Sequence, residues 1–178
     1  MKKLWIILGV GVAIIAISIA LIFLFFPKKY ESEIDALALK YNLSPYLIAS
    51  VINIESGYDE RALSDAGAMG LMQILPSTAE DCASRLDIDY NKEDLYSSQY
   101  NMEIGCYYIN YLMEMFEGNI TNVLASYNWG LGNVKSWMNE GNIDENGTII
   151  NIPVKETRDY LKKFNINRFV YKNLYGYN

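Results

Sequence analysis

The stretch of sequence that decides the fold is ESGYDERALSDAGAMGLMQILP, which occupies residues 55–76. Its first residue, Glu55, ends a segment whose apolar residues recur at helical spacing. Glu55 stands four positions after Val51 and three after Ile52, so it falls on the apolar stripe of the predicted helix. A carboxyl group there is desolvated, which raises its pKa and suits a general acid. The alternative is a solvated glutamate in the last turn, at the rim of the core.

The segments on either side of Glu55 predict the limits of its helix. Ser44 and Pro45 supply an N-cap and a first-turn proline, so the helix begins at Pro45 and runs to about Ser56, where Gly57 is placed to stop it. Residues 59–70 are rich in Gly, Ala, Ser and Asp, which predicts a loop.

The rest of the chain predicts a mainly α fold made of helices with short breaks. Apolar spacing and helix-start signals place further helices at residues 31–41, from Pro76 through Ala83, around Ile104, Tyr108, Tyr111, Leu112 and Met115 up to Gly118, at 121–128, at 133–139, and after Pro153 through Tyr160, Leu161 and Phe164. Residues 140–151 favour turns and a small hairpin before Ile149. The aromatic tail, with Phe169, Tyr171, Tyr175 and Tyr177, is expected to pack on the body.

The amino-terminal part is a long apolar run. No charged residue occurs from Leu4 to Phe26, and about 23 residues span roughly 34 Å as a helix, enough for a bilayer core of about 30 Å. A cleaved signal peptide is the alternative. The run is longer than a usual signal core, and no small-x-small cleavage site follows it, which favours an uncleaved anchor. The positive-inside rule then puts the amino terminus in the cytoplasm and the remaining domain outside.

Charge and composition exclude several classes of protein. After the apolar run there are 13 basic and 21 acidic residues, a net charge of −8, which argues against nucleic-acid binding. The chain has no histidine, which removes Ser-His and Cys-His catalysis and histidine metal sites. Cys82 and Cys106 are too few for a structural zinc site, and whether they form a disulfide stays open. We expect no metal and no cofactor.

Three ordered blocks carry a family resemblance. Residues 55–56 are Glu-Ser, and residues 67–74 read GAMGLMQI; residues 126–134 read SYNWGLGNV; residues 152–160 read IPVKETRDY. The blocks resemble those of the soluble lytic transglycosylases, lysozyme-like enzymes that cut peptidoglycan, whose pattern includes Gly-Ala-x-Gly-Leu-Met-Gln, then Ala-Tyr-Asn-Ala-Gly-x-Gly-x-Val, then Ile-Pro-x-x-Glu-Thr-Arg-x-Tyr. The resemblance spans about Ile34 to Phe164. Ser126 and Trp129 depart from it, each replacing an alanine, and Trp129 either adds a face on which a sugar can stack or fills a gap in the packing.

The resemblance implies roles for particular residues. Glu55 matches the single catalytic carboxylate. The residues that match the glycan-binding cleft are Ser64, Met72, Gln73, Tyr127, Asn128 and Tyr160, the last with its hydroxyl near the catalytic carboxylate. Glu156 and Arg158 match a supporting pair. Because they stand two positions apart on one helix, they are expected to reach different partners, one of which is the loop near Glu55.

The resemblance implies a lyase reaction in which Glu55 acts first as acid and then as base. The bond between N-acetylmuramic acid and N-acetylglucosamine is broken and a 1,6-anhydro end forms without water. One alternative is a muramidase that hydrolyses the same bond. Another is a wall-binding module without catalysis, and a third is a structural membrane protein. The expected organisation is an anchor over residues 1–27 and a catalytic domain over residues 28–178, on the outer side of the membrane, with peptidoglycan strands as the partner and protein partners unknown.

Overall fold

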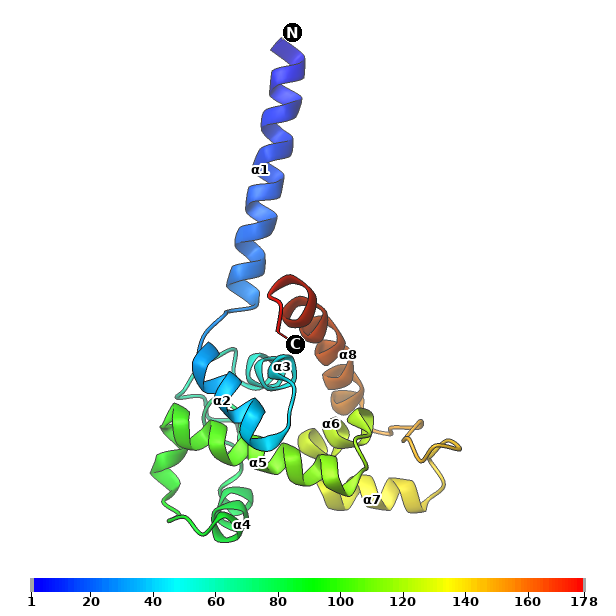
Figure 1. Cartoon of the computed structure of the whole chain (residues 1–178). Coiled ribbons are helices and arrows are strands. Elements are labelled where there is room, and N and C mark those ends of the chain that lie inside the picture. The colour runs from blue at the N-terminus through cyan, green and yellow to red at the C-terminus, as the bar shows by residue number, and fades with distance from the viewer. Residues whose placement is uncertain (1, 178) are drawn as a thin grey trace.

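The computed structural model describes residues 2–177, and helices supply almost all of the regular structure in that range (Figure 1). Among these residues, extended pairing is limited to isolated antiparallel bridges such as Ile143 with Ile149. The α-helices are α1 (Lys2–Phe25), α2 (Glu31–Tyr41), α3 (Pro45–Glu55), α4 (Pro76–Leu86), α5 (Ser98–Met115), α6 (Ile120–Trp129), α7 (Leu131–Asn139) and α8 (Lys155–Phe169). Two shorter helices, η1 (Lys92–Tyr96) and η2 (Val170–Leu174), lie before α5 and after α8.

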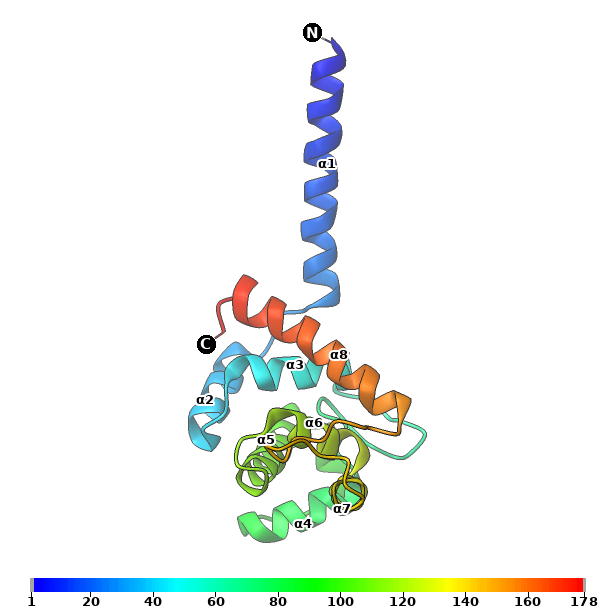
Figure 2. The ribbon, with the colours of Figure 1, turned by 90° about the vertical axis from the view of Figure 1, so that its right-hand side faces the viewer.

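Helix α1 projects from the body as a single rod, and the other helices gather at its foot (Figures 1 and 2). Over Trp5–Phe25 it is long and apolar enough to cross a membrane, and none of that stretch is buried in the body. A signal sequence would meet the same criteria of length and composition.

The sequence defines α2 and α3 closely. Helix α2 has the predicted bounds and buries Ile34, Leu37, Ala38 and Tyr41. Helix α3 begins at Pro45 as predicted, although the Ser44 side chain makes no capping hydrogen bond. Gly57, just beyond the helix end, has φ of +60°, a conformation that glycine adopts at little cost.

The core surrounds α3, which packs against α2 and α8, while α5 packs against α2, α4 and α6. Of the predicted stripe on α5, only Ile104 and Leu112 are fully buried, and Tyr108, Tyr111 and Met115 are half-buried. The buried face is instead centred on small or apolar side chains with no hydroxyl to solvate, namely Met102, Ile104, Gly105, Cys106, Ile109 and Leu112, together with the hydrogen-bonded Asn101. The prediction for this face was therefore only partly correct.

The structure also describes the two cysteines, whose pairing was left open, and the aromatic tail, which was expected to pack on the body. Cys82 and Cys106 are buried and remain free thiols. Tyr171 and Tyr177 are buried as predicted, but Phe169 is 60% exposed, so its predicted packing is wrong. Phe169 is the last residue of α8 and lies on the side of the helix that faces away from the core.

Candidate active site

The site is built where the end of α3 meets the middle of α8. Glu55 is the last residue of α3 and is half-buried. Tyr160, on α8, is buried and donates a hydrogen bond of 2.8 Å from its hydroxyl to Oε1 of Glu55. The pairing of α3 with α8 therefore fixes the position of the carboxyl group.

Burial dominates the electrostatics of this carboxyl group. Desolvation raises the pKa of Glu55 from its ordinary value of 4.5 to about 7. The Tyr160 hydrogen bond opposes that shift, the negative charge of Glu156 adds to it, and the positive charge of Lys163 opposes it. Near neutral pH a large fraction of Glu55 is consequently protonated, so the group can donate a proton and later accept one.

Glu55 opens onto a cleft of about 460 Å³. The walls come from the loop before α4, the first turn of α4, and the end of α6 with the start of α7. The lining residues are Glu55, Ser64, Ala66, Ala68, Gln73, Ile74, Leu75, Thr78, Tyr108, Tyr127, Asn128, Trp129, Gly130, Asn133 and Glu156.

A buried asparagine holds the loop that forms one wall. Asn101 accepts a 2.7 Å hydrogen bond from the Met72 amide and donates to the carbonyls of Met69 and Leu95 at 2.8 and 2.9 Å. Gly70 has φ of +75°, and a Cβ there would collide with the Leu95 carbonyl and the Asn101 side chain. Only glycine lets this loop approach α5 so closely.

Gln73 and Ser64 are both oriented by the same loop. The Gln73 amide nitrogen donates to the carbonyls of Ala62 at 3.1 Å and Gly70 at 3.0 Å, which leaves its Oε1 as the acceptor at the cleft. The Ser64 hydroxyl accepts a 3.0 Å hydrogen bond from the Ala68 amide and so closes the loop.

On the opposite wall of the cleft, the side-chain amide of Asn128 has its oxygen hydrogen-bonded within the protein and its nitrogen available. Its Oδ1 accepts a 2.8 Å hydrogen bond from the buried Thr157 hydroxyl, and within residues 2–177 its amide nitrogen has no protein acceptor. The cleft therefore presents an amide acceptor from Gln73 and an amide donor from Asn128. Its neighbour Tyr127 donates a 2.8 Å hydrogen bond to the Met72 carbonyl and joins the two walls.

Of the nine predicted site residues, six line the cleft, and Met72, Tyr160 and Arg158 do not. Tyr160 is buried beside Glu55, to which it donates its hydrogen bond.

The Met72 side chain is fully buried, and a Cβ on Gly105 would collide with its sulfur, so its predicted place in the cleft wall is wrong. Its main-chain groups serve the site through Tyr127 and Asn101. The sequence did not predict Leu75 as a cleft residue, although it is 41% exposed and lines the cleft. The only indication was an apolar residue directly before the proline that opens α4.

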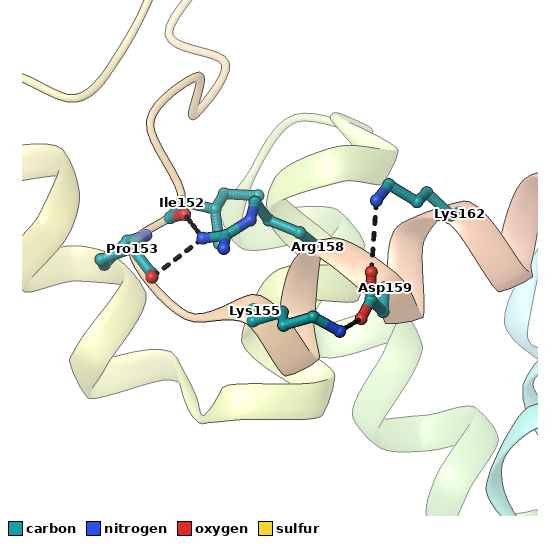
Figure 3. Close-up of polar contacts among 6 residues, drawn as sticks. All are labelled: Ile152, Pro153, Lys155, Arg158, Asp159 and Lys162. Carbon is teal, nitrogen blue, oxygen red and sulfur yellow. Dashed lines mark hydrogen bonds and ion pairs between the residues drawn. The ribbon is translucent and has the colours of Figure 1, made fainter.

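Glu156 and Arg158 diverge as the spacing predicted. Glu156 is exposed at the cleft, whereas Arg158 donates to the carbonyls of Ile152 at 2.6 Å and Pro153 at 2.9 Å (Figure 3). Arg158 therefore fixes the entry into α8. Glu156 is the member of the pair that lies near Glu55, because it lines the same cleft and its charge raises the pKa of Glu55, whereas both partners of Arg158 precede α8.

In the part of the chain that the structure describes, no group of three or more carboxylate or cysteine side chains is placed to hold a metal ion.

The known proteins whose sequences resemble this chain include several lytic murein transglycosylases. The chain is 30% identical over 173 residues to a putative soluble lytic murein transglycosylase of Haemophilus influenzae, covering 96% of this chain and 29% of that protein. It is 35% identical over 156 residues to the soluble lytic murein transglycosylase of Escherichia coli, covering 85% of this chain and 24% of the relative. The chain thus spans less than a third of the length of these relatives.

Solved structures show the same likeness. The lytic transglycosylase Slt from Pseudomonas aeruginosa, solved as an inactive mutant, superposes with a TM-score of 0.79 at 26% identity, over 86% of this chain and 25% of that one. The 70 kDa soluble lytic transglycosylase of Escherichia coli gives 0.77 at 28% identity, over 85% and 25%. The fold is therefore the mainly α, lysozyme-like one that the sequence predicted. The family model described as "Transglycosylase SLT domain" matches residues 32–149, well over half of the chain, which belongs to this family.

Proposed function

We propose that this protein is a membrane-anchored lytic transglycosylase that cleaves peptidoglycan glycan strands. The observation that carries the proposal is a half-buried Glu55 with its pKa raised to about 7, held by Tyr160 beside a cleft that offers one amide acceptor and one amide donor. An N-acetylated sugar has a complementary amide N–H and C=O in each acetamido group, so the cleft suits such a chain.

The proposed reaction uses Glu55 twice. Protonated Glu55 gives its proton to the oxygen that links N-acetylmuramic acid to N-acetylglucosamine, and that bond breaks. The 2-acetamido group of the muramoyl residue stabilises the cation that forms. Glu55, now a carboxylate, takes the proton from the muramoyl 6-hydroxyl, whose oxygen closes the 1,6-anhydro ring. No water is consumed, and Glu55 returns to its protonated form.

A hydrolytic route through the same cleft would need a second group. Ordinary glycosidases use two carboxylates, and Glu156 is the other carboxylate in the lining of the cleft. Glu156 is exposed and lies in the first turn of α8, whereas Glu55 is desolvated. In the proposed scheme Glu156 acts only through its charge, which raises the pKa of Glu55.

The same proposal assigns the parts of the chain. Residues 1–27 hold the protein in the membrane with the amino terminus in the cytoplasm, and residues 28–178 form the catalytic domain, which faces the wall. The length and apolar character of the helix over Trp5–Phe25 support the anchor. A membrane-bound lytic murein transglycosylase C of Actinobacillus pleuropneumoniae, 27% identical over 170 residues and covering 83% of this chain and 47% of its own length, shows that such a domain also occurs in a membrane-bound relative.

The deciding experiment is mass spectrometry of muropeptides released from purified peptidoglycan by the full chain in detergent. Products one water lighter than hydrolysis products, with 1,6-anhydro ends, are expected. Products with reducing ends would make the protein a muramidase. No release with glycan binding intact would make it a binding module. The same assay on Glu55→Gln should show a loss of release by several orders of magnitude. Glu145→Gln, at an exposed turn outside the cleft lining, is the matched control.

A further inference from the structure

The carboxyl-terminal tail is attached to the foot of α1. The Tyr175 ring stacks on Phe23, with ring centroids 5.9 Å apart, and its hydroxyl donates a 2.8 Å hydrogen bond to the Phe26 carbonyl. The Tyr171 hydroxyl donates to the Pro27 carbonyl at 2.9 Å. Because Phe23 lies inside the apolar stretch Trp5–Phe25, the tail reaches the level of the last turn of that stretch.

Three large apolar side chains of the tail face solvent beside this junction. Ile166, Phe169 and Leu174 are 59%, 60% and 52% exposed. Ile166 and Phe169 are three positions apart on α8, so they share one face. In both views the last turns of α8 lie level with the lower end of α1 (Figures 1 and 2). We call these three residues the tail patch.

The charge around the tail patch has one sign. From residue 160 to the end, the sequence has four basic residues, Lys162, Lys163, Arg168 and Lys172, and no acidic one, in a chain of net charge −6. Arg168 and Lys172 lie over the Tyr46 ring, at 5.9 and 5.2 Å from its centroid. Within residues 2–177 neither has a carboxylate within salt-bridge distance.

The charges of the segment that follows α1 are mixed. Lys28 lies over the ring of the tail residue Tyr177, 5.6 Å from its centroid, and is paired with Glu31 at 2.5 Å, and Glu33 lies in the same first turn of α2.

Within the tail Lys162 is paired with Asp159 at 3.2 Å. Among residues 2–177, Arg168 and Lys172 are therefore cations without a carboxylate partner that accompany the exposed apolar side chains, and Lys29 adds another at the foot of α1.

We propose that the tail patch, with Arg168 and Lys172, is a second membrane contact that docks on the anionic surface of the bilayer that holds α1. This inference rests on the anchor proposed above. Apolar side chains beside Lys and Arg are the combination that settles at the boundary between headgroups and acyl chains of an acidic bilayer. Tyr171 and Tyr175 place amphipathic rings at the same level, as in the aromatic belts of membrane proteins. The tether through α1 keeps the patch near the surface, so a weak contact suffices.

The test uses the full chain in vesicles of phosphatidylcholine with about one third phosphatidylglycerol. An environment-sensitive fluorophore is attached to Phe169→Cys or Leu174→Cys, and lipids with a quencher near the headgroup are titrated. Ile150→Cys is the matched control, because Ile150 is also an exposed apolar residue, at 56%, but lies in the turn before α8. Ile14→Cys, near the middle of α1, reports on the anchor itself, and for this label the lipids carry the quencher in the acyl chain. The native cysteines are both buried.

Labels at 169 and 174 are expected to shift to the blue and to be quenched at least fivefold more strongly than the label at 150. Arg168→Glu with Lys172→Glu is expected to abolish most of that difference, and raised salt to weaken it. A quenched label at 14 with an unquenched label at 169 would overturn the second contact and leave the anchor standing. An unquenched label at 14 would overturn the anchor and the contact together. A blue-shifted but unquenched label at 169 would mean that a second copy covers the patch, which also overturns the proposal.

Discussion

The hydroxyl of Tyr160 and the carboxyl of Glu55, 105 positions apart in the chain, are joined by a hydrogen bond of 2.8 Å. The tyrosine is a donor to the charged form of the carboxyl group, so it holds the pKa of Glu55 below the value that burial alone would give. Burial also keeps the pKa of Tyr160 well above its usual range, so the phenol stays protonated. The pair thus balances desolvation against hydrogen bonding to keep Glu55 near the protonation state that both steps need.

Tyr160→Phe tests this balance directly. Without the donor, the pKa of Glu55 rises further above 7, so the loss of activity at alkaline pH moves to higher pH. Turnover is expected to fall by roughly tenfold, less than in Glu55→Gln, because the proton donor remains. The measurement is kcat/KM against pH for muropeptide release. Tyr100→Phe, whose hydroxyl binds the Asp89 carbonyl on the surface, is the control and should keep the wild-type profile. Inactivity of Tyr160→Phe equal to that of Glu55→Gln would contradict this supporting role.

Glu55→Gln should lose activity by several orders of magnitude and yet stabilise the fold at alkaline pH. Because the folded pKa of about 7 exceeds the ordinary 4.5, the folded state binds the extra proton, and the free energy of unfolding falls as pH rises from about 4.5 to about 7. Glutamine removes that loss. At pH 8 the variant should be more stable by roughly 1–2 kcal/mol, less than a fully enclosed carboxylate would give because the cleft admits water, and near pH 4.5 the two should agree. Thermal unfolding of the full chain in detergent at both pH values checks this.

Glu156→Gln separates the one-carboxylate scheme from a two-carboxylate hydrolase. In the proposed scheme, turnover stays within about tenfold, and the alkaline limb of the pH profile moves to lower pH, because a charge that raises the pKa of Glu55 is gone. The profile is measured as for Tyr160→Phe. A loss as complete as that of Glu55→Gln would show that Glu156 takes part in the chemistry. Glu140→Gln, an exposed acid at the end of α7 and outside the cleft lining, is the control.

Thr157→Val tests how Asn128 is oriented. The variant keeps the shape of the side chain but removes the hydroxyl that donates to Oδ1 of Asn128. The amide can then rotate, so KM should rise by about fivefold to tenfold, of the order expected for one hydrogen bond, while the pH profile set by Glu55 stays in place. Thr157→Ser, which retains the hydroxyl, should restore most of the affinity. An unchanged KM in Thr157→Val would show that the amide is oriented by other means.

Trp129→Ala tests the aromatic residue that departs from the family pattern. The ring is half-buried in the cleft lining, next to Asn128, and presents an apolar face to a sugar. Its removal should weaken binding of N-acetylglucosamine oligomers to the Glu55→Gln chain by about tenfold, measured by calorimetry. Trp137→Phe is the control, because Trp137 is a buried tryptophan of α7 that packs with Ala125 and Val134, outside the cleft lining. Equal affinity with and without the Trp129 ring would reduce it to a packing residue.

Local signals explain what could be predicted from the sequence. The bounds of α2 and the start of α3 follow from periodicity and from Pro45, both of which act within one or two turns. The position of Glu55 on an apolar stripe left open whether its carboxyl group is desolvated or solvated, and the family resemblance favoured the catalytic interpretation. The resemblance supplied Tyr160 and Asn128, which periodicity alone could not have joined to Glu55.

The remaining features depend on contacts between distant segments. Met72 and Leu75 are both apolar residues of one loop, and only the packing of that loop on Gly105 decides that the first is buried and the second exposed. Asn101 reads as a polar residue in a helix, and its three hydrogen bonds to the loop and to Leu95 become visible only in three dimensions. Phe169 was expected to be covered because it is aromatic, but no segment within residues 2–177 buries it.

Helix α8 has a consequence for where in the wall the enzyme would work. Its residues from Tyr160 to Phe169 form one uninterrupted helical segment, about 14 Å long at 1.5 Å per residue. One end holds the reacting carboxyl group and the other meets the foot of α1. A rigid helix of this length fixes the distance between the membrane and the carboxyl group. With α1 in a bilayer, bonds would be cut only in a thin layer of glycan within a few nanometres of the membrane. Under the proposed anchor and activity, the distance between the membrane and the bonds that are cut would therefore depend on the length of α8 between Tyr160 and Phe169.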